Sequence, residues 1–192
     1  MTALARLNTA SSRGAAEVQN AASMKGLPVA LVAALVMVES AGRESAWRFE
    51  APYRYYWDVR AVKPFREPTA AERAGERAPA DFAALPDISS RDTEWAGQAC
   101  SWGPLQVMGA VTREYGYLGA FPALCSWGVG LEYGLLHLTR LRNRFLDKYT
   151  WAGVVAAYNA GSPRRIDGGL DWVNQDYVNR VRAMGGFEGL DA

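Results

Sequence analysis

Residues 29–40 read Val-Ala-Leu-Val-Ala-Ala-Leu-Val-Met-Val-Glu-Ser, and this stretch decides the fold class. Nearly every residue from Val29 to Val38 is apolar, which predicts a helix buried on most of its sides. A buried strand would also be apolar, but the length of the run and its alanines favour a helix. The run follows Gly26-Leu27-Pro28, and a proline suits the first helical turn because its missing N–H is not needed there.

Further apolar patterns predict helices near 110–115, 129–149, 151–157 and 172–184. The third of these should end at Gly161, since glycine followed by a proline is a common helix stop. No internal repeat and no alternating series typical of strands is visible. The sequence therefore predicts a mostly α single domain over residues 26–192. Residues 1–25 would form an N-terminal extension with room for one amphipathic helix.

Residues 42–99 differ in character from the rest of the chain. Aromatic residues cluster at 53–57, and charged residues dominate 66–77. Inserted segments of this length usually serve as lids or binding loops. We expect a long insertion with one or two short helices, of which Glu67–Ala78 is the most exposed and mobile. Regular structure is interrupted by prolines at 52, 64, 68, 79 and 86.

The composition is that of a folded protein without a strong charge bias. Hydrophobic residues make up 49% and charged residues 21% of the chain, and the formal net charge is +1. Such a balance gives no reason to expect nucleic acid as a partner. The longest apolar run, Leu27–Val38, is too short for a membrane span and lacks the surroundings of a signal peptide. We expect a monomer without an integral membrane segment, made in the cytoplasm.

Few residues are available for metal, redox or triad chemistry. His137 is the only histidine, which leaves little material for a zinc site or a histidine-based triad and favours a structural role. No phosphate-binding glycine loop is present. We therefore expect no cofactor and no metal. Cys100 and Cys125 could pair or stay free, and the missing export signal favours free thiols.

Glu39 is the main candidate for chemistry. Residues 32, 35 and 36 lie on the same helical face, so its carboxyl emerges above an apolar stripe. Burial disfavours the charged form of a carboxyl and raises its pKa, which suits a general acid near neutral pH. A glutamate that simply points into water from a helix end is the alternative.

Cleavage of a glycosidic bond usually employs a second carboxyl group, unless the substrate supplies its own nucleophile. No motif singles out one second carboxylate. The candidates, all within the insertion, are Glu44, Glu50, Asp58, Asp92 and Glu94.

Two further stretches carry polar groups next to tight backbone. Residues 103–108 read Gly-Pro-Leu-Gln-Val-Met, and Gln106 can both donate and accept hydrogen bonds. Residues 157–161 read Ala-Tyr-Asn-Ala-Gly, which places Tyr158 and Asn159 at a helix end. Taken singly, each has a structural alternative: a turn entering a helix, a core tyrosine and a capping asparagine.

Together and in this order, these motifs resemble the lytic transglycosylases with a goose-type lysozyme-like fold, the soluble lytic transglycosylase type of glycoside hydrolase family 23. The family's Glu-Ser matches Glu39-Ser40, and its Ala-Tyr-Asn-Ala-Gly is intact at 157–161. Its Gly-Leu-Met-Gln motif is matched in part at 103–108. Its Tyr-Val-x-x-Val tail pattern appears at Tyr177–Val181. The resemblance spans about residues 27–184.

The resemblance implies that Glu39 protonates the bond between N-acetylmuramic acid and N-acetylglucosamine. The same group would then activate the muramoyl 6-hydroxyl, which closes a 1,6-anhydro ring. Tyr158 would lie against the Glu39 carboxyl, and Gln106 would bind the sugar nearby. A serine that contributes in the family is left unassigned here; Ser101 lies two residues before Gly103. The other groove residues would be Ser40, Gly103, Met108 and Asn159.

The expected partner is the peptidoglycan glycan strand, and the expected place of action is the bacterial cell wall. Lacking an export signal, the chain resembles phage-type lytic enzymes, which reach the periplasm through a holin, a virion or a secretion apparatus. A hydrolytic muramidase or chitinase on the same fold is one alternative. A catalytically inactive glycan-binding or virion structural protein is another.

Overall fold

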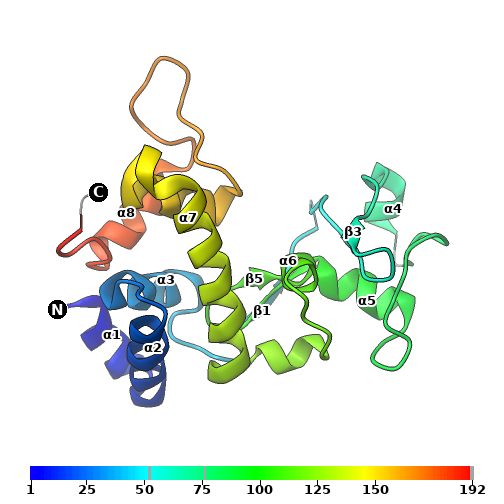
Figure 1. The fold of residues 1–192 in the computed structure, drawn as a ribbon, viewed down its shortest axis with the longest axis horizontal. Helices are drawn as coiled ribbons and strands as arrows, with labels where there is room; N and C mark the ends of the chain where they lie inside the picture. Colours follow the sequence, from blue (N-terminus) through cyan, green and yellow to red (C-terminus); the bar gives the residue numbers. More distant parts are fainter. Residues whose placement is uncertain (52, 76, 191–192) are drawn as a thin grey trace. The chain divides into compact units, whose positions relative to one another are not determined.

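The computed structural model describes residues 1–51, 53–75 and 77–190; Pro52, counted above among the helix-interrupting prolines, lies outside them. Helices dominate the regular structure, which confirms the mostly α prediction (Figure 1). The chain divides into two compact units. One comprises Met1–Arg43 with Gly134–Ala192, and the other comprises Glu44–Tyr133. The second unit therefore begins near the start of the expected insertion but extends well beyond its expected end.

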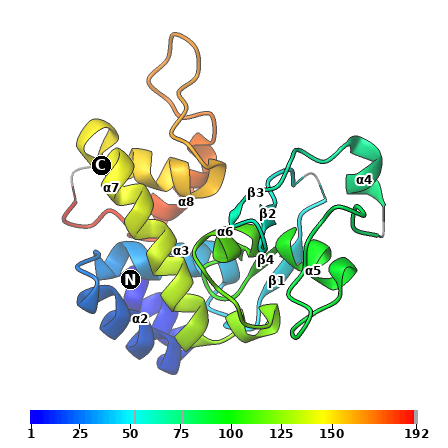
Figure 2. The same ribbon diagram turned by 45° about the vertical axis from the view of Figure 1, so that its right-hand side comes forward.

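The first unit is built around α3 (Val29–Ser40), the apolar helix expected from the sequence. Every residue from Leu31 to Val36 is 0% exposed. α3 packs against α1 (Ala3–Ala10), α2 (Ser12–Met24) and α8 (Gln175–Ala183) (Figure 2). The central position of α3 in this unit explains why its sequence is so apolar.

The first 25 residues form part of this core, and they carry two helices where the sequence predicted one. Thr2 and Ser11 start the two helices, because each side chain accepts a hydrogen bond from a backbone N–H of the first turn. Leu7 and Val18 are both 0% exposed. The segment is therefore a packed component of the first unit.

α7 (Trp127–Ala160) is interrupted at Thr150, whose φ of 55° and ψ of −174° are not helical. The interruption separates the two helices that the sequence predicted at 129–149 and 151–157. Residues of α7 up to Tyr133 belong to the second unit, and those from Gly134 belong to the first. The helix ends at Ala160, and Gly161 follows with a φ of 75°, as the stop signal predicted.

The second unit contains short strands that the sequence analysis did not find. Strands β1 (Trp47–Phe49), β4 (Cys100–Trp102) and β5 (Val107–Met108) form an antiparallel sheet in the order β1-β4-β5. β2 (Trp57–Asp58) pairs with β3 (Lys63–Pro64). Strands of two or three residues are too short to produce a recognisable alternation of apolar and polar residues.

The second unit has further helical elements and, within the expected insertion, an aromatic core. Tyr56 stacks on Trp95 with ring centroids 3.8 Å apart, and Phe82 meets both rings edge-on. Much of the expected insertion is thus a folded unit with its own core. α4 (Ala70–Ala74) has no buried residue, which agrees with the exposure expected for that part of the segment. These elements are α4 (Ala70–Ala74), α5 (Arg91–Gln98), α6 (Gly109–Glu114) and the 3-10 helix η1 (Phe121–Leu124).

Candidate functional site

Glu39 lies in the last turn of α3 and is half-buried. The helix ends directly after Ser40 because Ala41 and Gly42 both have left-handed backbone conformations, with φ of 54° and 78°. Their N–H groups donate to the carbonyls of Met37 and Val36 at 3.2 and 3.4 Å. These bonds satisfy carbonyls at the helix end and fix the direction in which the chain leaves it. Glu39 is therefore presented from a rigid, well-packed element.

The hydroxyl of Tyr177 donates a hydrogen bond to Oε1 of Glu39. Tyr177 lies on α8, which packs on α3, and is 4% exposed. Burial raises the pKa of Tyr177 well above 10, and the negative charge of Glu39 and the hydrogen bond raise it further. The phenol therefore keeps its proton near pH 7 and acts as a donor to the carboxyl group.

Sequence reasoning placed Tyr158 against Glu39 and gave no role there to Tyr177. The tail pattern at Tyr177–Val181 was the signal that could have found it. Tyr158 is half-buried, and it lies near enough to Tyr177 to contribute to the raised pKa of that phenol. The expected role of Tyr158 beside the acid stays a prediction.

His137 packs against Tyr158, with ring centroids 5.2 Å apart. Burial and, as the smaller cause, the charge of Arg140 lower the pKa of His137 to about 4. The imidazole is therefore neutral near pH 7. A neutral ring against a tyrosine is consistent with the structural role that the sequence favoured for the single histidine.

Asn159 is exposed at the end of α7. Its Oδ1 accepts a hydrogen bond from Nδ2 of Asn174 at 2.9 Å, and the same Nδ2 donates to the carbonyl of Ala156 at 3.0 Å. Asn174 thus holds the Asn159 side chain to the helix end. An exposed but oriented amide suits binding of a polar ligand.

Ser40 is 2% exposed, and its hydroxyl donates to the carbonyl of Val36 at 3.0 Å. Its own carbonyl accepts a hydrogen bond from Nε of Arg43 at 3.1 Å. In this structure the hydrogen bonds of Ser40 stabilise the end of α3, and the residue offers almost no surface to a substrate.

The second unit holds Gln106 in the turn between β4 and β5. Its Nε2 donates to the carbonyls of Ala46 and Gly103 at 3.0 and 2.8 Å, and its Oε1 accepts from Oγ of Ser101 at 2.9 Å. Gly103 has a φ of 74°, and a Cβ there would lie 2.2 Å from the carbonyl oxygen of Leu124. The glycine is therefore required by close backbone approach as well as by conformation.

These contacts give Gln106 and Ser101 a definite part in holding the turn together. Met108 is half-buried at the end of β5 and directly precedes α6. That Gly103, Gln106 and Met108 shape a sugar groove stays a prediction. So does the expectation that they share one groove with Glu39, Tyr158 and Asn159, which belong to the first unit.

The candidate second carboxylates all belong to the second unit, and each has a local partner. Glu94 is 0% exposed and forms a bidentate ion pair with Arg113. Glu44 accepts from the backbone N–H of Trp127, and Glu50 pairs with Arg48. Asp58 caps the turn after β2, and Asp92 accepts from the backbone N–H of Ala78. Glu94 is the member of this set whose role is plainly structural.

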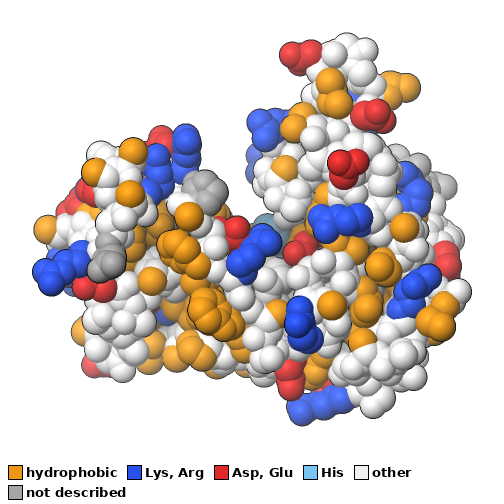
Figure 3. Space-filling model, turned by 180° about the vertical axis from the view of Figure 1, so that it is seen from behind, with side chains coloured by type: hydrophobic (Ala, Val, Ile, Leu, Met, Phe, Trp, Pro, Cys, Tyr) orange, Lys and Arg blue, Asp and Glu red, His pale blue; other side chains and the backbone are white. Residues whose placement is uncertain are grey.

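Cys100 and Cys125 are free thiols, as the sequence favoured. Among the described residues no group of three or more His, Cys, Asp and Glu side chains is placed to hold a metal ion. Within the same residues no helix has the length and apolarity needed to cross a membrane. On the face seen in Figure 3, Lys and Arg side chains are interspersed with Asp and Glu.

Comparisons of the chain with protein-family models, with curated proteins and with solved structures gave no match.

Proposed function

We propose that this chain is a peptidoglycan lytic transglycosylase that cleaves the β-1,4 bond between N-acetylmuramic acid and N-acetylglucosamine. The observation that carries the proposal is the setting of Glu39. Its carboxyl group is half-buried at the end of an apolar helix and accepts a hydrogen bond from the buried phenol of Tyr177. The motifs at 39–40, 103–108 and 157–161 support the same assignment.

Two opposing influences act on the ionised form of the Glu39 carboxyl group. An ionised carboxylate in the last turn of a helix meets the partial negative charge of the terminal carbonyls, and partial burial disfavours it as well. Tyr177 offsets these effects by donating a hydrogen bond to the carboxylate. Such a balance suits a group that must release a proton and then take one back within a single catalytic cycle.

In the proposed reaction, protonated Glu39 gives its proton to the glycosidic oxygen as the bond from that oxygen to C1 of the muramoyl residue breaks. The carbonyl oxygen of the substrate's own N-acetyl group attacks C1 and carries the positive charge that develops. Ionised Glu39 then removes the proton from the 6-hydroxyl of the same residue. That oxygen attacks C1, displaces the N-acetyl oxygen and closes the 1,6-anhydro ring. No second carboxylate is needed, because the substrate supplies both nucleophiles.

A zymogram with purified cell wall tests the assignment of Glu39. We expect the unmodified protein to clear the gel and the Glu39→Gln variant to leave it opaque, while both unfold at similar temperatures. Glu132→Gln, which neutralises an exposed glutamate of α7, is the matched control and should clear the gel as the unmodified protein does. Equal clearing by Glu39→Gln would contradict the proposal.

The products separate this reaction from its alternatives. Mass spectrometry of the digest should show glycan fragments that end in 1,6-anhydro-muramic acid. Fragments with reducing ends would identify a hydrolase instead. A folded protein that binds cell wall but releases no fragments would identify a binding or structural protein.

A further inference from the structure

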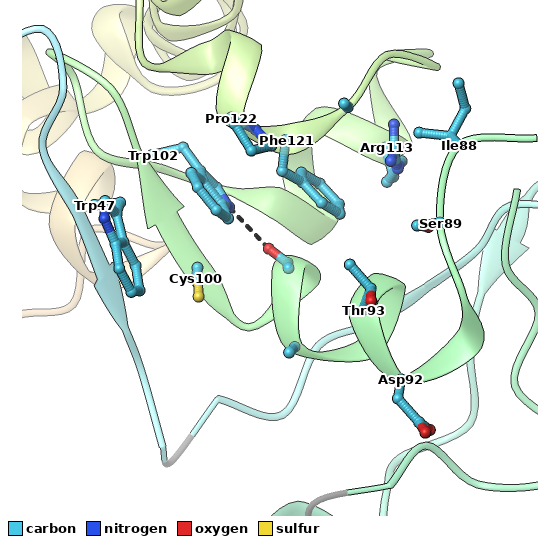
Figure 4. A pocket seen from close by; sticks show the side chains of 13 residues that line it. Trp47, Ile88, Ser89, Asp92, Thr93, Cys100, Trp102, Arg113, Phe121 and Pro122 are labelled. Carbon is cyan, nitrogen blue, oxygen red and sulfur yellow. Dashed lines mark hydrogen bonds between the residues drawn. The ribbon is translucent and has the colours of Figure 1, made fainter.

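The second unit contains an open pocket of about 640 Å³ beside its sheet (Figure 4). This volume lies within the roughly 300–1,000 Å³ typical of small-molecule sites. One wall is aromatic, and the other is formed by α5. The first wall includes Trp47, Trp102 and Phe121, and the second includes Asp92, Thr93 and Ala96.

The aromatic wall is a row of nearly parallel rings. Trp47 of β1 stacks on Trp102 of β4, with centroids 5.9 Å apart and planes inclined by 21°. Trp102 stacks in turn on Phe121, at 5.7 Å and 9°. Trp47 is nevertheless 61% exposed. One face of its indole is thus supported by the row while much of the ring remains open to solvent.

The row is fixed before any ligand arrives. The indole N–H of Trp102 donates to the carbonyl of Gly97 at 2.8 Å. A Cβ on Gly97 would lie 2.2 Å from a ring carbon of Phe121, so only glycine leaves room for that ring. The guanidinium of Arg113 covers Phe121 at 4.1 Å. Rings held in this way lose little conformational freedom when they bind a ligand.

The charge around the pocket argues against an anionic ligand. Among the described residues that line it, Arg113 is the only cation. Its three nitrogens all donate hydrogen bonds, to the carboxylate of Glu94 and to the carbonyls of Tyr117 and Gly119. Asp92 adds a negative charge to the opposite wall, and Thr93 adds a hydroxyl group. A phosphate or a nucleic acid would find no free positive charge there.

We propose that this pocket binds an uncharged oligosaccharide of N-acetylhexosamine units. The C–H face of a pyranose ring stacks on the exposed indole of Trp47, and sugar hydroxyls bond to the hydroxyl of Thr93, which lies between the rings and Asp92 in Figure 4. Aromatic faces with a few placed polar groups are the combination that orients such a ligand. The inference goes beyond the chemistry of Glu39, because the pocket lies wholly within the second unit. The choice of an N-acetylglucosamine oligomer as ligand rests on the proposed function.

A titration of the full chain with chitotetraose, followed by NMR of the indole N–H groups, tests the proposal. The chain carries Glu39→Gln so that the ligand is not cut, and the signals of Trp47 and Trp102 are assigned from the Trp47→Phe and Trp102→Phe variants. We expect both signals to shift and to saturate. Trp47→Ala should weaken the binding seen at Trp102 at least tenfold. Phe49→Ala removes a ring from the same strand that is 52% exposed and lies outside the pocket, so it should leave the affinity unchanged.

Unmoved Trp47 and Trp102 signals, or equal affinity in Trp47→Ala, would overturn the proposal. Shifts caused by a peptide or an alkyl detergent but not by chitotetraose would also overturn it. The result is separable from the proposed function. If Glu39→Gln clears cell wall as the unmodified protein does, the catalytic assignment fails while a Trp47-dependent shift still establishes the sugar site. If cleavage depends on Glu39 but the indole signals stay unmoved, the sugar site fails while the catalytic assignment stands.

Discussion

The hydroxyl of Tyr177 donates a hydrogen bond to the carboxylate of Glu39, a residue 138 positions earlier in the chain. The contact joins the end of α3 to α8, so it depends on the packing of these two helices. Because the phenol stays protonated, the bond is available whether Glu39 is gaining or losing its proton. Tyr177 is therefore placed to hold Glu39, the proposed acid, in one orientation.

Replacing Tyr177 by Phe should lower kcat about tenfold or more, since a hydrogen bond to a charged group contributes about 1.5–3 kcal/mol. The alkaline limb of the pH–activity profile should move to higher pH, because the lost donor favoured the ionised carboxylate. Steady-state kinetics over a range of pH measures both effects. Tyr149→Phe, in the same unit, is the control and should leave the profile unchanged. A uniform loss of activity without a shifted limb would indicate that Tyr177 acts only through folding.

Replacing Tyr158 by Phe should lower turnover and leave folding intact. The expectation rests on the resemblance and on the position of Tyr158 near the Tyr177 phenol. Turnover on soluble wall fragments, measured beside the unfolding temperature, checks it. Unchanged turnover would remove Tyr158 from the proposed site.

Glu94 and Arg113 form an ion pair in which both side chains are 0% exposed. Arg113→Met should destabilise the protein by about 3–5 kcal/mol, because it leaves a buried carboxylate without its partner. The double variant Glu94→Leu with Arg113→Met should recover part of that loss. Urea unfolding measures the differences. Arg66→Met, which breaks an exposed network with Glu72 and Asp81, should change the midpoint little. An equal effect at both sites would contradict this reading of the buried pair.

His137 should make folding stability depend on pH between about 6.5 and 4. Its pKa in the folded protein is lowered to about 4, so below pH 6.5 the unfolded chain binds a proton that the folded chain does not. Stability is therefore lost as the pH falls through this window. His137→Phe should show a smaller fall in unfolding temperature between pH 7 and pH 4.5. Parallel thermal curves for the two proteins would refute the assignment.

Cys100 should react slowly with alkylating reagents in the folded protein. Burial and, as the smaller cause, the charge of Glu50 raise the pKa of its thiol to about 11, so little reactive thiolate is present at pH 8. Guanidinium at about 6 M is on the order of the concentration needed to unfold most domains. Iodoacetamide labelling followed by mass spectrometry should show Cys100 modified far faster in that denaturant than in buffer. Cys100→Ser supplies the control for the labelled peptide.

The helices were predictable because their apolar patterns are local. The run from Val29 to Val38 defined α3, and the glycine and proline after Ala160 marked the end of α7. The aromatic core of the second unit was not predictable in the same way. Tyr56, Phe82 and Trp95 are far apart in a proline-rich segment, and no periodic pattern connects them. The segment therefore resembled a loop although it folds around a core of its own.

The candidate acid followed from the sequence, whereas its hydrogen bond from Tyr177 did not. Glu39 was identified from the apolar residues that precede it on one helix. Tyr177 reaches it only through the packing of α8 on α3. Gln106 was singled out as a polar residue near a glycine, and the structure adds its hydrogen bonds to Ala46, Gly103 and Ser101.

The sequence by itself determined that the protein is mostly helical, where its most apolar helix lies and which carboxyl group that helix carries. These properties depend on the spacing of residues within one turn or a few turns. Only the tertiary structure decided which phenol meets Glu39, which carboxylate pairs with Arg113 and which rings line up behind Trp47. Such contacts join residues distant along the chain, so they form only when whole helices and strands have packed against one another.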